Sequence, residues 1–249
     1  GDGICLWDAK DASGGAAAWQ KNFNPAYPES GFIRIWDNSG DFTTVAFLID
    51  LLNVTGTKPA LVRYPDIVAK FGMEGDFTDS SGNGYNGVAK NGAAFTSDKV
   101  WGYSAGSFKA ANDYVTVGNL YGNFPDNTFD IEAWVKLDDT GNGSRRAIAG
   151  GTGAAADYSI GLIDNQFMVS AGNGSAVNYA KSGIVPNPGQ WYHVAGTYDG
   201  SNLRIYVNGE LKNTVSAAWR QSNGGADFWI GGESCCSSNN YNGLIDEVA

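Results

Sequence analysis

The hydrophobic and polar positions of this chain alternate in short runs that are separated by turn-forming residues. In the run FDIEAWVKLD, the residues Ile131, Ala133, Val135 and Leu137 fall on one side of an extended chain. The same alternation recurs in residues 203–207. A period of two is that of a half-buried β-strand. The pattern therefore predicts many short strands, and it offers no apolar stripe of helical period.

Residues 191–213, WYHVAGTYDGSNLRIYVNGELKN, predict an antiparallel meander. Asp199-Gly200 marks its first turn. Asn208-Gly209 supplies the two positive-φ residues of a tight type I′ turn. Such a meander is expected to have one face on a hydrophobic core and one face toward water. We interpret it as part of a scaffold whose loops carry recognition.

The pattern divides the chain into a small β-rich unit, residues 1–65, and a larger domain, residues 66–249, with the boundary at Tyr64-Pro65-Asp66. About 65 residues give a marginal core, so the small unit is expected to pack on the larger domain. In the larger domain, closely spaced short strands predict a two-sheet antiparallel sandwich. Strands are expected at 4–8, 31–37, 43–51 and 59–64 in the small unit, and at 67–75 at the start of the larger domain.

Composition and net charge limit the classes of binding partner that are expected. The 249 residues include 35 glycines but 7 prolines, and the formal net charge is −10 with a pI of about 4.4. Nucleic acid is excluded as an expected partner because phosphate binding needs clustered Lys and Arg. The acidity is explained by solubility or, for some Asp residues, by Ca²⁺ binding. The longest apolar run, residues 45–52, contains Asp50 and is too short to span a membrane.

The sequence does not decide whether the three cysteines form a disulfide bond. Cys5 could pair with Cys235 or with Cys236, the vicinal Cys235 and Cys236 could pair with each other, or all three could be free thiols. No pair has metal-ligand spacing, and His193 lies within a strand pattern, so no zinc site is expected. Gly- and Asn-rich loops with candidate disulfides favour an exported protein. The start at Gly1, without Met, leads us to expect a processed or excised fragment.

Six segments in order carry a family resemblance: VAKFGMEGDFTDSSGNGYNG, YVTV, FDIEAWVKL, WYHVAGTYDGSNLRIYVNGEL, WIGG and YNGLIDEVA. Together they resemble the laminin-G-like, concanavalin-A-like jelly roll of many secreted proteins, over about residues 66–249. The resemblance implies an all-β, two-sheet jelly-roll sandwich, with its last strand continuing beyond Ala249. Residues 1–65 are similar to a β domain that often precedes such jelly rolls in cell-surface proteins and in some inner-membrane proton-channel proteins.

The resemblance also implies a structural Ca²⁺ ion. Family members often hold Ca²⁺ between the loop after the first segment and the Asp of the terminal strand. Carried over to this sequence, the expected ligands are Asp79, Asn83 and Asn86 with Asp246. Their carboxylate and amide oxygens are the ligands that Ca²⁺ prefers. The alternative is a surface turn in which the Asp and Asn side chains bind local backbone groups.

Saccharide recognition requires exposed aromatic rings beside polar groups. Trp219 and Arg220 lie in the polar loop AAWRQSNGGAD and are the first candidates. Tyr158, Tyr179 and Tyr241 are the further candidates. The alternative is that the aromatic residues of a sandwich belong to its core. We assign that role to Trp134, Trp191 and Trp229, which lie in strand patterns or at strand edges.

No enzyme activity is expected, because glycosidases need two carboxylates facing the scissile bond. Glu132 stands alone in its strand, Asp138-Asp139 fall at a strand end, and the adjacent Asp246-Glu247 point to opposite faces. The sequence predicts a non-catalytic extracellular, cell-surface or periplasmic module that binds a polysaccharide or glycoconjugate. The alternative is an assembly role as a filament subunit, adhesin stalk or periplasmic spacer, which would bind other copies of the chain or other surface proteins.

Overall fold

The protein was analysed as a computed structural model that divides into two compact units, Gly1–Val62 and Arg63–Ala249. The structure describes residues 31–36, 42–47 and 67–249, apart from 110–111, 121, 125–126, 140, 152–157, 221–226 and 234–240. In the first unit, β1 (Gly31–Trp36) and β2 (Phe42–Phe47) overlap the strands expected at 31–37 and 43–51, and they pair antiparallel with each other. The strands expected at 4–8 and 59–64 lie outside the described residues.

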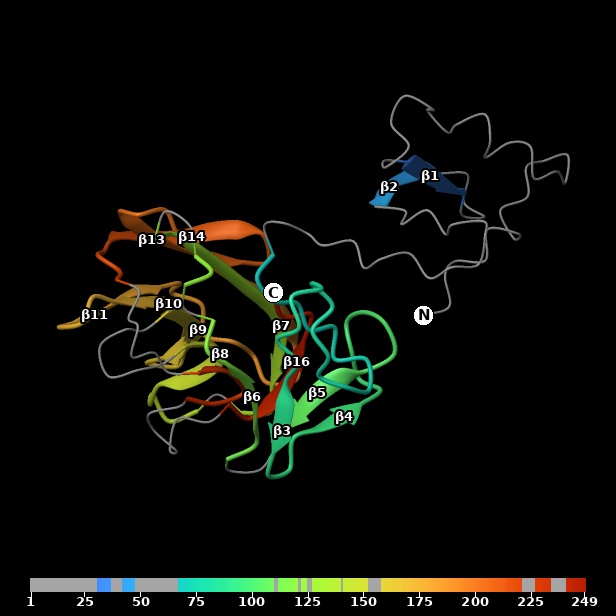
Figure 1. Cartoon of the computed structure of the whole chain (residues 1–249), viewed down its shortest axis with the longest axis horizontal. Helices are drawn as coiled ribbons and strands as arrows, with labels where there is room; N and C mark the ends of the chain where they lie inside the picture. The colour runs from blue at the N-terminus through green and yellow to red at the C-terminus, as the bar shows by residue number, and fades with distance from the viewer. Residues whose placement is uncertain are drawn as a thin grey trace, which may run out of the picture. The chain divides into compact units, whose positions relative to one another are not determined.

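The second unit is a sandwich of two antiparallel sheets of seven strands each (Figure 1). Sheet 1 has the order β11-β10-β9-β8-β15-β6-β3, and sheet 2 has the order β14-β13-β12-β7-β16-β5-β4. Neighbours in each sheet are often distant in sequence, which is the crossover pattern of a jelly roll. The strands are β3 (Val88–Lys90), β4 (Ala94–Thr96), β5 (Ala105–Phe108), β6 (Tyr114–Gly118), β7 (Phe129–Leu137), β8 (Arg146–Gly151), β9 (Tyr158–Ile163), β10 (Gln166–Gly172), β11 (Val177–Lys181), β12 (Trp191–Tyr198), β13 (Asn202–Val207), β14 (Glu210–Ser216), β15 (Phe228–Ile230) and β16 (Gly243–Asp246).

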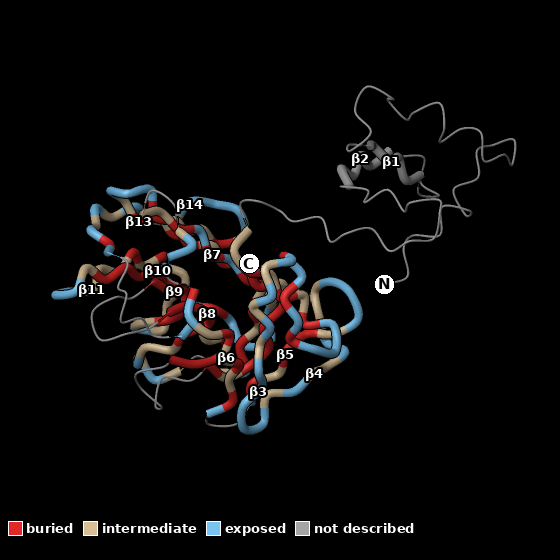
Figure 2. Tube along the Cα trace, in the orientation of Figure 1, coloured by how far each residue is buried: buried red, intermediate tan, exposed pale blue. Residues whose placement is uncertain are grey.

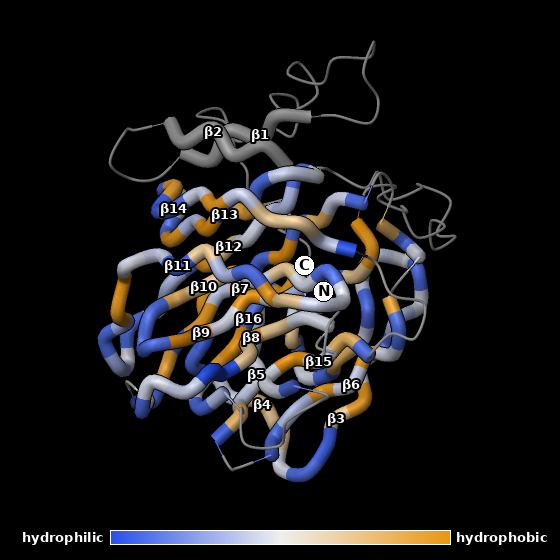
Figure 3. Tube along the Cα trace, turned by 90° about the vertical axis from the view of Figure 1, so that its left-hand side faces the viewer, coloured by the Kyte–Doolittle hydropathy of each residue, from blue (hydrophilic) through white to orange (hydrophobic). Residues whose placement is uncertain are grey.

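The alternation read from the sequence is confirmed in the strands that it identified most clearly. Every second residue of β7 is buried, from Phe129 through Val135 to Leu137, and β12 and β13 alternate in the same way. Asn208 and Gly209 have φ angles of 53° and 78°, as a type I′ turn between β13 and β14 requires. Figure 3 shows hydrophobic and hydrophilic positions alternating along strands of the sandwich.

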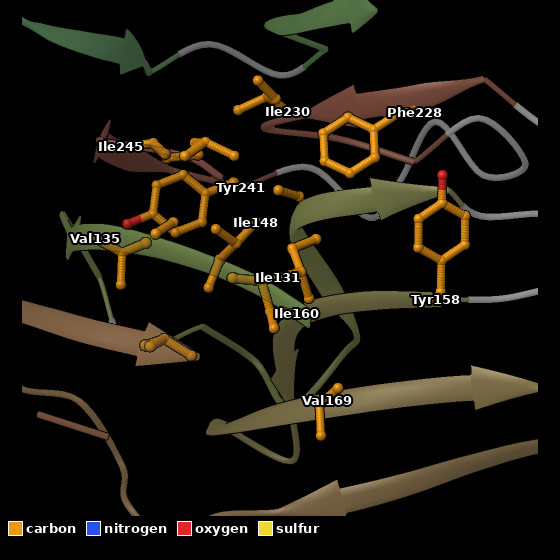
Figure 4. Close-up of a cluster of buried hydrophobic side chains, with 14 of the residues drawn as sticks. Ile131, Val135, Ile148, Tyr158, Ile160, Val169, Phe228, Ile230, Tyr241 and Ile245 are labelled. Atoms are coloured by element: carbon orange, nitrogen blue, oxygen red, sulfur yellow. The ribbon is translucent and has the colours of Figure 1, made fainter. Parts of the chain in front are cut away.

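The core lies between the two sheets (Figures 2 and 4). Val135 and Ile245 of sheet 2 and Ile148, Ile160 and Val169 of sheet 1 are all fully buried. Each buried aliphatic side chain of this size contributes about 1.5–3 kcal/mol through removal from water. The outward residues of the same strands are therefore free to carry chemistry without loss of the core.

The expected strand at 67–75 is wrong for the second unit, where this segment forms a single bridge between Phe71 and Val248. Side chains of the following loop bind several of its other backbone groups. Asp79 accepts the Lys70 N–H, and Asn83 donates to the carbonyls of Ile67 and Val68. Because these groups bind side chains, they cannot extend a β-ladder.

Candidate functional site

The loop that was expected to bind Ca²⁺ is organised by the buried carboxylate of Asp79. Oδ1 accepts the N–H groups of Lys70 at 3.0 Å and Ser81 at 2.8 Å, and Oδ2 accepts the Tyr85 N–H and the Ser81 hydroxyl, both at 2.9 Å. Burial raises the pKa of Asp79, but these hydrogen bonds together outweigh it and lower the pKa. Asn86 accepts the Asp79 N–H, and Asn83 donates to the preceding segment.

Asp246 belongs to a different network. Its buried carboxylate accepts the N–H groups of Val100 at 2.9 Å, Trp101 at 3.2 Å and Glu247 at 3.0 Å. Burial raises its pKa by more than these hydrogen bonds lower it. Among the described residues, no three His, Cys, Asp or Glu side chains lie close enough to hold one metal ion. Since N–H dipoles point at the oxygens of both Asp79 and Asp246, this arrangement does not fit a cation.

Calcium binding therefore stays a prediction from the resemblance. The hydrogen bonds of Asp79 lead us to expect that Ca²⁺ does not bind at this carboxylate. We expect the melting temperature to be the same in excess Ca²⁺ and in EGTA, because the acceptor positions of Asp79 are filled by protein donors. Differential scanning calorimetry of the full chain checks this, with Mg²⁺ as the matched control. A shift of several degrees, near the ~2.7 kcal/mol that a ligand contributes at 100 times its Kd, would instead support a rearranged Ca²⁺ site.

Three of the aromatic residues expected to bind a ligand lie in the core instead. Trp219, Tyr158 and Tyr241 are 4%, 1% and 1% exposed, which contradicts their expected role as accessible platforms. Figure 4 shows Tyr158 and Tyr241 among the side chains between the sheets. The Trp219 ring contacts Phe129 with ring centroids 5.0 Å apart, because a large apolar ring in a loop beside the core gains more by burial than by exposure.

The two remaining ligand-binding candidates, Arg220 and Tyr179, are at least partly exposed. Arg220 is exposed, and its N–H donates to the carbonyl of Gly172 at 3.1 Å. Tyr179 is partly exposed on β11. The disulfide candidates Cys5, Cys235 and Cys236 lie outside the described residues.

Tyr179 stands at one end of a row of residues that crosses sheet 1 on its outer face. Direct cross-strand pairing joins Tyr179 to Ser170, Ser170 to Ser159, Ser159 to Gly150 and Gly150 to Trp229. We call these five residues the outer row. Its two ends are aromatic and its three central positions are small. Four strand spacings of about 4.8 Å separate the ends by about 19 Å, a span that several sugar rings would cover.

Gly150, the outer-row residue next to Trp229, is a glycine for a steric reason. A Cβ atom there would overlap the backbone of Tyr158 and Ser159 on the neighbouring strand. All three central residues, Gly150, Ser159 and Ser170, are buried.

An ion pair lies over the small residues. Arg145 Nε is 2.6 Å from Glu233 Oε1, a close charge contact without hydrogen-bond geometry. Arg145 Nη2 donates to Ser159 Oγ at 2.9 Å, Ser159 and Ser170 share a hydrogen bond at 2.8 Å, and the guanidinium lies 5.7 Å from the Tyr179 ring centroid. The Glu233 side chain is 1% exposed. A buried charge pair is costly to desolvate, so its place outside the hydrophobic core favours a functional role.

Trp229 closes the other end of the outer row. Its ring stacks on Tyr114, with centroids 4.1 Å apart and planes 7° apart, so its orientation is fixed by packing. Its indole Nε1 is buried and has no hydrogen-bond partner among the described residues. An unsatisfied buried donor on a sheet surface is a site that a ligand oxygen or a water can satisfy.

A separate cavity of about 590 Å³ lies along β7, beside Val248 and Ala249. Asp130 and Glu132 on β7 both line it, which the sequence interpretation of Glu132 as an isolated acid missed. His193, 3.3 Å away, holds the pKa of Glu132 down, while burial and the charge of Glu132 raise the pKa of Asp130. Ala249, which pairs with Glu132 through two backbone hydrogen bonds, also lines this cavity, whereas the residues of the outer row are not among its lining residues.

The sequence of the second unit decides its family. The family model of the concanavalin A-like lectin/glucanases superfamily matches residues 108–249, more than half of the chain. The chain belongs to this superfamily. The all-β jelly-roll expectation is thereby confirmed for this concanavalin A-like chain, together with its two antiparallel sheets. No curated protein matches it in sequence.

Solved structures with this fold include saccharide-binding proteins. Domain 4 of AbnA, a GH43 extracellular arabinanase from Geobacillus stearothermophilus, was solved in complex with arabinotriose. It matches with a TM-score of 0.60 and 22% identity over 73% of this chain and 89% of that one. The binding domain of botulinum neurotoxin DC in complex with SialylT matches with a TM-score of 0.53 and 15% identity over 73% and 46%.

The same toxin domain in complex with rat synaptotagmin II matches with a TM-score of 0.55 and 16% identity, over 73% of this chain and 47% of that one. This concanavalin A-like chain thus spans less than half of the toxin domains. Identities this low show the fold alone. In the part of the chain that the structure describes, no helix is both long and apolar enough to cross a bilayer.

Sequence reasoning missed Trp229, Arg145 and Glu233. Trp229 was assigned to the core because it lies in the apolar run DFWIGG. Its neighbours Phe228 and Ile230 are buried, so the period of two directs Trp229 to the opposite face. That period was the available signal for Trp229. The pairing of Arg145 with Glu233, 88 positions apart, has no local signal.

Proposed function

We propose that this concanavalin A-like chain is a non-catalytic, extracellular carbohydrate-binding module, and that its outer row contacts a polysaccharide or glycoconjugate. The observation that carries the proposal is the outer row itself, in which two partly exposed aromatic side chains flank three buried small residues. Aromatic rings stack on the C–H faces of sugars, and fixed polar groups bind hydroxyls. Solved structures of the same fold in complex with arabinotriose and with SialylT support the saccharide class.

The test is a titration of the full chain with a saccharide panel, by isothermal calorimetry and on a glycan array. The panel includes arabinotriose, longer arabinan fragments and a sialylated oligosaccharide. We expect at least one saccharide to bind with a Kd between about 1 mM and 1 µM, roughly −4 to −8 kcal/mol. Absence of binding across the panel would contradict the proposal.

A reducing-end assay on the same panel separates binding from hydrolysis. Asp130 and Glu132 are the acids to change, since their pKa values are shifted in opposite directions in one cavity. If the unaltered chain produces new reducing ends and the Asp130→Asn and Glu132→Gln variants do not, the chain is a glycan-cleaving enzyme and the non-catalytic proposal is wrong. If no saccharide of the panel is cleaved, the result supports the non-catalytic proposal.

The assembly alternative is tested by light scattering at high protein concentration. Concentration-dependent oligomers or filaments, together with no saccharide binding, would favour a structural subunit. Monomers that bind a saccharide favour the module.

A further inference from the structure

The two most exposed aromatic side chains of the described residues belong to one loop, outside the outer row. Trp101 is 67% exposed and Tyr103 is 60% exposed, in the loop between β4 and β5. Large aromatic side chains are the residues that gain most from burial, and an exposed pair of them marks an interaction surface more often than scattered aliphatic residues do.

Two carboxylates hold the backbone of this loop. Asp246 accepts the N–H groups of Val100 and Trp101, and Glu74 accepts those of Tyr103 and Ser104. We call this arrangement the carboxylate clasp. Four of the five N–H groups from residue 100 to residue 104 are thereby bound to charged acceptors, which form the stronger class of hydrogen bond.

Gly102 is required at the centre of the clasp. Its φ angle is +65°, which side-chain-bearing residues rarely adopt, and a Cβ atom there would overlap the Glu74 carboxylate. The loop is therefore held in one conformation while its two large side chains remain in water. A rigid loop that exposes aromatic rings loses little conformational entropy when it binds a ligand.

The clasp places Trp101 and Tyr103 on the side of the sandwich away from the outer row. Asp246 pairs across the strands with Trp134 on the outer face of sheet 2. The neighbouring Asp98 accepts from Lys136 Nζ at 2.6 Å and from Trp191 Nε1 at 3.3 Å, and both donors lie on that same face. The loop thus covers part of the outer face of sheet 2.

From this geometry we propose that Trp101 and Tyr103 form a second saccharide-contact site. The proposal rests on the proposed carbohydrate-binding function and adds a second site to it. Beside the loop Lys136 pairs with Asp98, and the two exposed rings suit a ligand with C–H faces and hydroxyls. The net charge of −10 disfavours an anionic membrane surface.

Two sites on opposite faces would let one chain contact two strands of a polysaccharide. Binding to an immobilised polymer then gains from effective concentration, whereas binding to a short oligosaccharide does not. The expected signature is a stoichiometry of two oligosaccharides per chain and tighter retention on the polymer.

The test compares the full chain with the double variant Trp101→Ala/Tyr103→Ala. The matched control is Leu211→Ala, which removes another exposed apolar side chain, 52% exposed on β14. With the best saccharide of the panel and its immobilised polymer, we expect the double variant to keep its melting temperature, fall to one site per chain and lose polymer retention at least tenfold. Gly102→Ala keeps both rings but breaks the clasp, and it should weaken polymer retention several-fold.

Each other outcome overturns the proposal in a distinguishable way. Saccharide binding that survives unchanged in the double variant removes the second site and leaves the proposed function standing. Absence of saccharide binding in the unaltered chain removes both. Co-sedimentation with vesicles of phosphatidylcholine and phosphatidylserine that is lost in the double variant would replace the saccharide with a membrane surface.

Discussion

Replacing Trp229 by alanine is expected to weaken saccharide binding at the outer row roughly 10- to 100-fold, or by about 1.4–2.7 kcal/mol. The ring is held in place by its stack on Tyr114, so it is ready to stack without reorganisation. Its indole Nε1 is buried and lacks a hydrogen-bond partner among the described residues. Calorimetric titration of the unaltered chain and the variant measures the loss.

A matched pair of tyrosines provides the control for this prediction. Tyr179 on sheet 1 and Tyr206 on sheet 2 are both partly exposed strand residues. Tyr179→Ala should weaken the binding of the same saccharide. Tyr206→Ala should leave the affinity for that saccharide within a factor of about two of the unaltered chain. Equal affinity of the Trp229→Ala variant and the unaltered chain, with the fold intact by circular dichroism, would remove the outer row from the site.

Replacing Asp246 by alanine is expected to destabilise the second unit by about 3 kcal/mol, because three backbone N–H groups lose a charged acceptor. The loss should be visible as a lower midpoint in urea-induced unfolding. Hydrogen exchange should accelerate first at Val100 and Trp101, whose N–H groups the carboxylate holds. Glu210→Ala on β14 is the control, since that side chain is 75% exposed and its removal should cost little.

The pH dependence of the Asp246 contribution has a definite sign. Burial raises its pKa, so the folded chain takes up the proton more readily than the unfolded chain does. Stability relative to Asp246→Asn should therefore increase as pH falls through the raised pKa toward the ordinary value of 3.8, and should be constant above it. Stability that instead falls relative to Asp246→Asn over this window would contradict the burial of the carboxylate.

The local sequence pattern was sufficient to predict strands that have one buried face and one solvent-exposed face. Residues of β7, β12 and β13 reveal their buried faces by alternation, and Asn208-Gly209 reveals its turn by the φ angles that it can adopt. The sandwich followed from the number and spacing of such strands. Family resemblance then supplied the jelly-roll order, which alternation cannot give.

Pattern failed where long-range contacts decide the environment of a side chain. Trp219 lies in a polar loop, yet rings that come from distant segments, among them Phe124 and Tyr158, enclose it. Asp246 accepts the N–H of Val100, which is 146 positions away, and the Ca²⁺ ligation that the resemblance implied for Asp246 stays a prediction. Neither contact leaves a mark in the local sequence, so the expected aromatic platform was placed on Trp219, which belongs to the core.

The central claim, that the outer row binds saccharide, is tested most directly by NMR titration of the tryptophan indole N–H signals. Of the eight tryptophans, Trp229 is the one that the account places in the outer row. On addition of arabinotriose, or of the best saccharide in the panel, its indole signal should move in proportion to occupancy and become protected from exchange. The core residue Trp219 should not respond. A titration in which saccharide binds while the Trp229 signal stays unchanged would contradict the account.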